Sequence, residues 1–141
     1  MKPTLMRILG LDVGDRRIGV AISDPVGLTA QPLMVIERRG GEADIRAVRT
    51  IVTEYDVGSI IVGLPLTMRG VEGPQAKKVM GFADSLRRGL SLPVHLLDER
   101  LTTMQGQRVL RETGASRAKR RLVIDQVAAQ LILQHFLETQ R

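Results

Sequence analysis

The feature that most constrains the fold is an uninterrupted apolar segment at residues 59–64, which stops at Pro65. A strand with one face in water alternates apolar and polar side chains, whereas a strand covered on both faces is apolar along its length. The segment therefore predicts a central strand in a sheet with helices packed on both sides. With 141 residues, of which 43% are apolar, the chain is long enough for one such core and too short for two, so we expect one domain over residues 1–141.

The rest of the pattern predicts the layout of that sheet. Gly14 and Asp15 predict a hairpin turn, and Pro32 predicts a strand at a sheet edge, where a missing amide donor is tolerated. The other predicted strands cover residues 7–13, 17–24, 28–38 and 93–97, and the predicted helices follow Gly40-Gly41, begin at Pro74, and cover about 102–114 and 122–137. This order predicts an α/β fold with a five-stranded mixed sheet. Its first three strands form an antiparallel meander, and helices cover both faces.

Composition excludes several classes of protein and of site. The chain has no cysteine, so disulfides, thiolate zinc sites, iron–sulfur clusters and cysteine nucleophiles are ruled out. His95 and His135 are far apart in the sequence, so we expect any metal ion to be held by oxygen ligands. No stretch approaches the roughly 18 apolar residues of a membrane span, and Arg7 and Asp12 interrupt the first apolar segment. We therefore expect a cytoplasmic protein with no membrane partner.

Positive charge is concentrated in one segment. The formal net charge is +6, and residues 100–121 carry seven basic residues and one acidic residue, while the rest of the chain is neutral overall. Such an excess is typical of a surface that binds nucleic-acid phosphates, and a solvated, solubilising face has the same composition. Three aromatic residues are too few for a base-stacking module, which favours a duplex or a structured backbone. The candidate phosphate contacts are Arg16, Arg17, Arg69, Arg100, Arg117, Lys119, Arg120 and Arg121.

Carboxylates occupy three positions where a folded core does not normally hold them. Asp12 ends the first predicted strand, Asp98 and Glu99 end the fifth, and Asp125 lies inside the apolar last helix. Each could have a structural role, in a turn or beside an arginine. If they meet, their repulsion is relieved most naturally by a hard divalent cation such as Mg²⁺ or Mn²⁺. A pair of such ions suits phosphodiester hydrolysis, because one can act on the attacking water and the other on the leaving oxygen.

Four segments in this order resemble the YqgF/RuvX family, and the resemblance spans residues 7–137. The segments are Asp12-Val13-Gly14-Asp15-Arg16-Arg17-Ile18-Gly19-Val20-Ala21, Val62-Gly63-Leu64-Pro65, Asp98-Glu99-Arg100-Leu101-Thr102-Thr103 and Ile124-Asp125-Gln126-Val127-Ala128-Ala129-Gln130-Leu131-Ile132-Leu133-Gln134. The first segment alone is also similar to a turn of actin-like ATPases. Those proteins close ATP between two such domains, whereas this chain has the length of one.

The resemblance implies an RNase H-like nuclease domain, in the superfamily of RuvC-type Holliday junction resolvases. It also implies an acidic triad of catalytic, metal-binding residues, carried here by Asp12, Glu99 and Asp125. Asp98 is the alternative to Glu99, because neighbouring strand residues point to opposite faces and only one of the two acids would enter the site. Members of the family are described as nucleases that mature the 5′ end of pre-16S ribosomal RNA, or as resolvases of four-way DNA junctions.

Two classes of function therefore remain open. One is an endonuclease that depends on Mg²⁺ or Mn²⁺ and acts in ribosomal RNA processing or in DNA recombination. The other is a non-catalytic nucleic-acid-binding module, in which the acids are structural. A two-fold symmetric junction would suit a homodimer, whereas RNA processing requires none. Where many relatives carry Asp-Gly in the loop after Pro65, this chain has Arg69-Gly70, which replaces an acid with a candidate phosphate contact.

Overall fold

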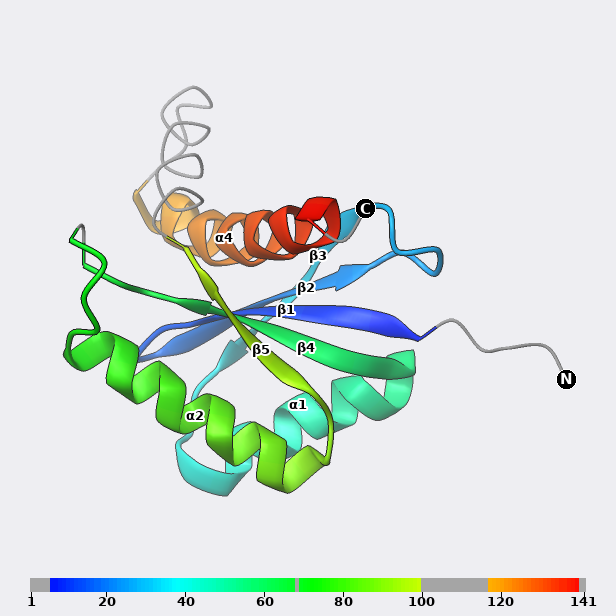
Figure 1. The fold of residues 1–141 in the computed structure, drawn as a ribbon, viewed down its shortest axis with the longest axis horizontal. Coiled ribbons are helices and arrows are strands. Elements are labelled where there is room, and N and C mark those ends of the chain that lie inside the picture. The colour runs from blue at the N-terminus through cyan, green and yellow to red at the C-terminus, as the bar shows by residue number, and fades with distance from the viewer. Residues whose placement is uncertain (1–5, 68, 100–116, 140–141) are drawn as a thin grey trace, which may run out of the picture.

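The computed structural model describes residues 6–67, 69–99 and 117–139, and within the last range it describes side chains from residue 126 onward. Its strands form one five-stranded sheet in the order β3-β2-β1-β4-β5 (Figure 1). The strands are β1 (Arg7–Val13), β2 (Arg17–Ser23), β3 (Ala30–Glu37), β4 (Val57–Leu64) and β5 (Val94–Asp98). The first three are antiparallel, and β1, β4 and β5 are parallel. The predicted mixed sheet with its antiparallel meander is confirmed.

Helices cover both faces of this sheet, as predicted. The helices are α1 (Gly41–Tyr55), α2 (Pro74–Leu90) and α4 (Arg117–Thr139). Helices α1 and α2 pack on one face, and α4 crosses the other, antiparallel to β1 (Figure 1). Helix α4 begins at Arg117 and not near residue 122 as predicted. Residues 117–121 are arginine, alanine and lysine, which are strong helix formers although most of them are charged. The helix predicted over residues 102–114 lies outside the described residues.

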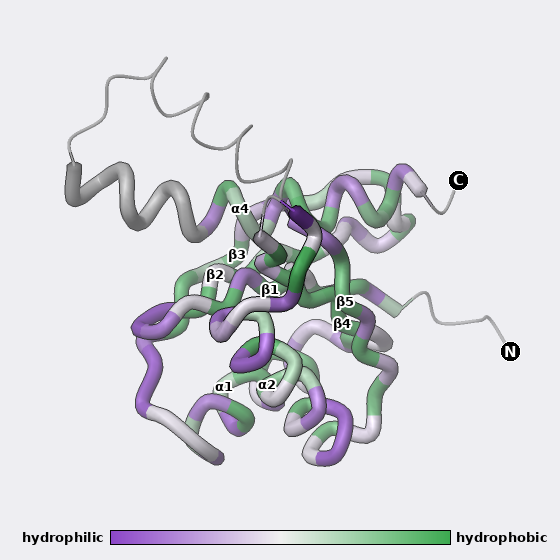
Figure 2. Tube along the Cα trace, turned by 60° about the vertical axis from the view of Figure 1, so that its left-hand side comes forward, coloured by the Kyte–Doolittle hydropathy of each residue, from purple (hydrophilic) through white to green (hydrophobic). Residues whose placement is uncertain are grey.

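The core has one layer on each side of the sheet. Adjacent residues Ile60 and Ile61 of β4 are both fully buried, and they belong to different layers. This confirms the prediction that β4 is covered on both faces. Figure 2 shows hydrophobic residues along the strands and, alternating with hydrophilic ones, along the coloured parts of the helices. Among the described residues, no helix is long and apolar enough to cross a membrane.

Pro32 lies in β3, at the edge of the sheet, as predicted. Two glutamine side chains of α4 bond to the start of this strand. Gln130 Nε2 donates to the carbonyl of Ala30 at 3.1 Å, and the amide of Ala30 donates to Gln134 Oε1 at 2.9 Å. These bonds fix α4 along the sheet and occupy backbone groups that an edge strand otherwise leaves open.

Helix α4 packs closely on the sheet at Gly10 of β1. A Cβ atom at this position would lie 2.8 Å from Cβ of Leu133 and 3.1 Å from the carbonyl oxygen of Ala129. Such distances are shorter than van der Waals contact, so any side chain at position 10 would push the helix away. The absence of a side chain here sets the distance between α4 and the sheet.

We predict that Gly10→Ala lowers the free energy of unfolding by about 1–3 kcal/mol, because the added methyl group overpacks this contact. Gly81 in α2 is the matched control, because no described atom outside its own helix backbone lies within 4 Å of a Cβ built there. Gly81→Ala should stabilise the protein by about 0.5–1 kcal/mol through helix propensity. Urea denaturation measures both effects. If both substitutions changed the free energy of unfolding in the same direction, the close contact at Gly10 would be contradicted.

Candidate active site

Two of the candidate acids meet at one edge of the sheet. Because β1, β4 and β5 are parallel, their carboxyl ends lie at the same edge. Asp12 is the last residue but one of β1, and Glu99 directly follows β5. Their carboxyl groups share a hydrogen bond across the intervening strand β4.

The residue of β4 between the two acids is Gly63. A Cβ atom there would collide with Oε2 of Glu99 and with the side chain of Ile132 in α4. Leu97 packs in the core layer under α4, and Glu99, two residues later, points to the same side. Gly63 therefore leaves the space that the Glu99 carboxylate occupies. Gly63 lies in one of the four family segments, but its residue type alone predicts no such role.

Burial and neighbouring charge keep Glu99 protonated over an unusual pH range. Its pKa is raised from 4.5 to about 8, first by burial, then by the negative charge of Asp12 and the hydrogen bond with it, and finally by the charge of Asp98. Ionising Glu99 would place two negative charges side by side in a poorly solvated position. Asp98 itself is exposed, so of the adjacent pair it is Glu99 that the structure brings to Asp12.

The third candidate acid, Asp125, is placed by its backbone alone. It precedes Ala129 by about one helical turn, and the carbonyl of Ala129 lies against Gly10 of β1. Because α4 is antiparallel to β1, the residues before Ala129 lie toward the end of the sheet that carries Asp12 (Figure 1). The side chain of Asp125 lies outside the described part of the structure.

The donor set at this edge suits a hard divalent cation. Mg²⁺ and Mn²⁺ prefer carboxylate oxygens, and a cation would remove the repulsion that raises the pKa of Glu99. Within the described residues, no group of three or more Asp, Glu or His side chains gathers closely enough to hold a metal ion. A complete site therefore needs a further ligand, and Asp125 is the candidate.

A buried ion pair holds the turn that follows Asp12. Arg38 Nε lies 3.1 Å from Oδ2 of Asp44, which is 1% exposed, and Arg38 Nη1 donates to the carbonyl of Gly14 at 2.7 Å. Asp44 also accepts hydrogen bonds from the amides of Arg39 and Gly40. Burial opposes its ionisation, but these bonds and the Arg38 charge hold the pKa of Asp44 below its ordinary value.

Asp44, the most buried carboxylate among the described residues, was not among the predicted functional residues. The available signal was an acid one turn inside a helix whose N-cap, Gly40, has no side chain. From within the first turns of the helix, Asp44 accepts a hydrogen bond from the amide of Gly40, as the acid of a capping box does.

The candidate phosphate contacts are only partly placed. Arg16 is exposed in the turn after β1, and Arg69 is exposed in the loop after β4, so both loops leave the sheet at the edge that carries Asp12. Arg17 is half-buried at the start of β2. Arg100 and the side chains of Arg117, Lys119, Arg120 and Arg121 lie outside the described residues.

Comparison with known proteins identifies close relatives. A family model described as "RuvX: Holliday junction resolvase" matches residues 6–139. The chain is 54% identical over 137 residues to a protein of Thermoanaerobacter pseudethanolicus named "Putative pre-16S rRNA nuclease", covering 96% of this chain and 99% of the relative. A protein of the same name from Myxococcus xanthus is 49% identical over 136 residues, covering 96% and 90%.

Two solved structures have the same fold. RuvC of Thermus thermophilus, in complex with a Holliday junction substrate, aligns with a TM-score of 0.57 at 17% identity, covering 96% of this chain and 95% of that one. The Holliday junction resolvase of fowlpox virus aligns with a TM-score of 0.59 at 14% identity, covering 96% and 100%. These resolvases have the RNase H-like fold, and the predicted fold class is confirmed.

The raised pKa of Glu99 predicts that the metal-free protein loses stability as pH rises from about 4.5 to about 8. In this window the folded state retains a proton that the unfolded state releases, so rising pH favours unfolding, with a slope of at most about 1.4 kcal/mol per pH unit. Glu99→Gln should flatten this slope, and Asp12→Asn should reduce it. Melting temperatures across the window, in the presence of a chelator, measure the effect. Glu37→Gln, at an exposed position, controls for the loss of one negative charge.

The ion pair with Arg38 predicts that Asp44→Ala lowers the free energy of unfolding by about 3 kcal/mol, because it leaves hydrogen-bond donors unsatisfied in the interior. The control is Glu42→Ala. Glu42 faces Arg46 at 3.9 Å and is 92% exposed, so its loss should change the free energy of unfolding by less than about 0.5 kcal/mol. Denaturant titration compares the two variants. Equal losses would show that Asp44 is no more important than a surface acid.

Proposed function

The chain belongs to the RuvX family, and on that premise we propose that it is an endonuclease that depends on a divalent metal ion and cuts phosphodiester bonds in structured nucleic acid. The observation that carries the proposal is the hydrogen-bonded carboxyl pair of Asp12 and Glu99 at the edge of the sheet. Placing two acids side by side in half-buried positions costs stability, which a protein without a ligand there would avoid by replacing one of them.

In this proposal Asp12, Glu99 and Asp125 hold the metal ions, Mg²⁺ or Mn²⁺, and two ions are expected from the chemistry. When bound, such ions supply Lewis-acid stabilisation of the charge that develops on the phosphate oxygens. The chain's own residues hold the two acids in position. Gly63 leaves room for Glu99 beneath α4, and Arg38 holds the turn that follows Asp12 through the carbonyl of Gly14.

Two substrates fit this chemistry. The names of the relatives favour maturation of pre-16S ribosomal RNA, a step of ribosome biogenesis that would take place in the cytoplasm. The family description favours resolution of four-way DNA junctions, a step of DNA recombination, and the shared fold agrees with both. Arg16 and Arg69, exposed on the loops beside Asp12, are the described candidates for substrate phosphates. A homodimer would match a two-fold symmetric junction.

We predict that Asp12→Asn and Glu99→Gln each lower the cleavage rate at least about 100-fold, because each removes a carboxylate that would hold the metal ions. Asp98→Asn, at the exposed neighbouring position, should lose less than about tenfold and is the matched control. The assay uses a four-way DNA junction and a pre-16S ribosomal RNA fragment, each with Mg²⁺ and with Mn²⁺.

The pattern of cleavage decides among the functions. Cutting of one substrate by the wild type identifies that substrate as the better candidate. Retained cutting by Asp12→Asn would refute the site. Binding of both substrates without cleavage, by the wild type, would favour the non-catalytic nucleic-acid-binding module.

A further inference from the structure

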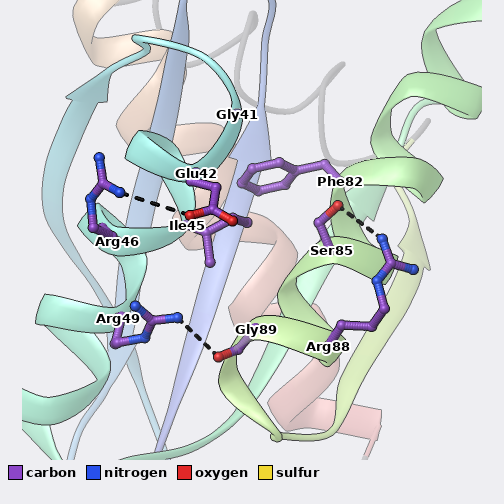
Figure 3. A pocket seen from close by; sticks show the side chains of 9 residues that line it. All are labelled: Gly41, Glu42, Ile45, Arg46, Arg49, Phe82, Ser85, Arg88 and Gly89. Atoms are coloured by element: carbon purple, nitrogen blue, oxygen red, sulfur yellow. Dashed lines mark hydrogen bonds and ion pairs between the residues drawn. The ribbon is translucent and has the colours of Figure 1, made fainter.

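A basic groove lies between α1 and α2, on the face of the sheet opposite α4 (Figure 3). Its volume is about 410 Å³. Three arginines line it, Arg46 and Arg49 from α1 and Arg88 from α2, against one carboxylate, Glu42. None of these residues belongs to the candidate active site, because Asp12 and Glu99 lie on the α4 side of the sheet.

The floor of the groove is fixed by a close contact between the two helices. A Cβ atom at Gly89 would lie 2.9 Å from Cγ2 of Ile45, so the glycine allows α2 to pack directly on α1. Arg49 Nη2 donates to the carbonyl of Gly89 at 3.0 Å and joins the helices above this contact. The half-buried ring of Phe82 also lines the groove and packs under the guanidinium of Arg38, 5.2 Å from the ring centroid. The shape of the groove is therefore set by packed residues.

The rim of the groove offers guanidinium donors. Arg88 Nη2 donates to Ser85 Oγ at 3.4 Å, and Arg46 Nη1 lies 3.9 Å from Glu42 Oε2 (Figure 3). The Arg46 side chain is 64% exposed, so this ion pair is weak and exchanges easily with another anion. A guanidinium carries five N–H donors in a planar fork that matches two oxygens of a phosphate.

We propose that this groove binds the phosphodiester backbone of the nucleic acid on which the protein acts, as a second contact surface away from the acids. The inference rests on the proposed function. Contacts between exposed arginines and phosphates are individually weak, because water and salt screen them, so they hold a polymer that makes several at once better than a single nucleotide.

The location of the groove also indicates the shape of its ligand. The acids and the groove lie on opposite faces of the sheet, so a nucleic acid that contacts both has to pass around the sheet. A folded RNA or a branched DNA presents backbone in several directions and can do so, whereas one straight duplex lies along a single face. The groove would thus favour structured substrates without reading their sequence.

The test measures binding in the cleavage-deficient Asp12→Asn background, with fluorescently labelled four-way DNA junction and RNA stem-loop as probes. The double substitution Arg46→Gln and Arg88→Gln should weaken binding about tenfold at physiological salt. It should also reduce the slope of log affinity against log salt by about one to two, because each phosphate contact contributes roughly one. Arg49 is left unchanged, because it joins the two helices.

Two single substitutions provide controls of opposite kind. Glu42→Gln removes the acid of the groove and should tighten binding roughly two- to threefold. Arg7→Gln removes an arginine near the start of β1, where its guanidinium lies 5.9 Å from the Tyr55 ring centroid, and should leave the salt slope unchanged. The inference would be overturned if the double substitution left the slope of log affinity against log salt unchanged. It would also be overturned if Arg7→Gln lowered affinity and slope as much as the double substitution does.

Further outcomes separate this inference from its premise. If the wild type cuts neither substrate but the double substitution still weakens binding, the proposed nuclease activity fails and the groove stands. If a nucleoside monophosphate at submillimolar concentration raises the melting temperature of the wild type but not of the double variant, the groove is a site for a free nucleotide, and the proposed polymeric ligand is overturned.

Discussion

The distance between α4 and the sheet is the constraint on which the candidate site depends. Two positions without side chains, Gly10 in β1 and Gly63 in β4, lie directly beneath the helix. At Gly10 the Cβ of Leu133 and the carbonyl oxygen of Ala129 fill the space that a Cβ atom would need, and at Gly63 the space is shared by Ile132 and the Glu99 carboxylate. The contact that packs the core thus also sets how near the helix comes to the strand ends, where the acids lie.

Among the described residues, buried Asp44 and half-buried Glu99 show two opposite responses of a carboxylate to loss of solvent. Asp44 stays ionised, because two backbone amides and the Arg38 side chain donate hydrogen bonds to it, and these outweigh the cost of burial. Glu99 faces another acid. Burial, and after it the negative charge of the neighbouring acids, raises the pKa of Glu99 to about 8. The first arrangement is complete within the chain and stabilises the turn after Asp12. The second is costly by itself, and its carboxylate oxygens are donors that suit the proposed cation.

Much of the fold could be predicted from the sequence, because hydrophobic periodicity determines it. The apolar run of β4, the edge position of Pro32 and the hairpin at Gly14 were all confirmed, with β1, β2 and β3 close to their predicted bounds. The start of α4 was wrong by five residues, since charge is a poor guide where helix propensity is high. Alternation along β5 left the choice between Asp98 and Glu99 open, because which face of an edge strand meets α4 is decided by sheet order and packing. The basic groove was missed because the residues that line it come from two helices that are distant in the sequence. Asp44 was missed although its partners are only four to six residues away, because two of its three donors are backbone amides, which no residue type identifies.

Charge on the two faces of the sheet links nucleic-acid binding to cation binding. The chain is positive overall, at +6, and attracts a polyanion, but the edge with Asp12, Asp98 and Glu99 repels the phosphate that would have to react there. A cation at that edge reverses the local sign, so it and a phosphate at the edge should strengthen each other's binding, as any two coupled ligands do reciprocally. The groove between α1 and α2 lies on the other face, and its arginines would need no cation to bind an anion. Nucleic acid could therefore bind at the groove first, and the metal ion would control only its approach to the acids.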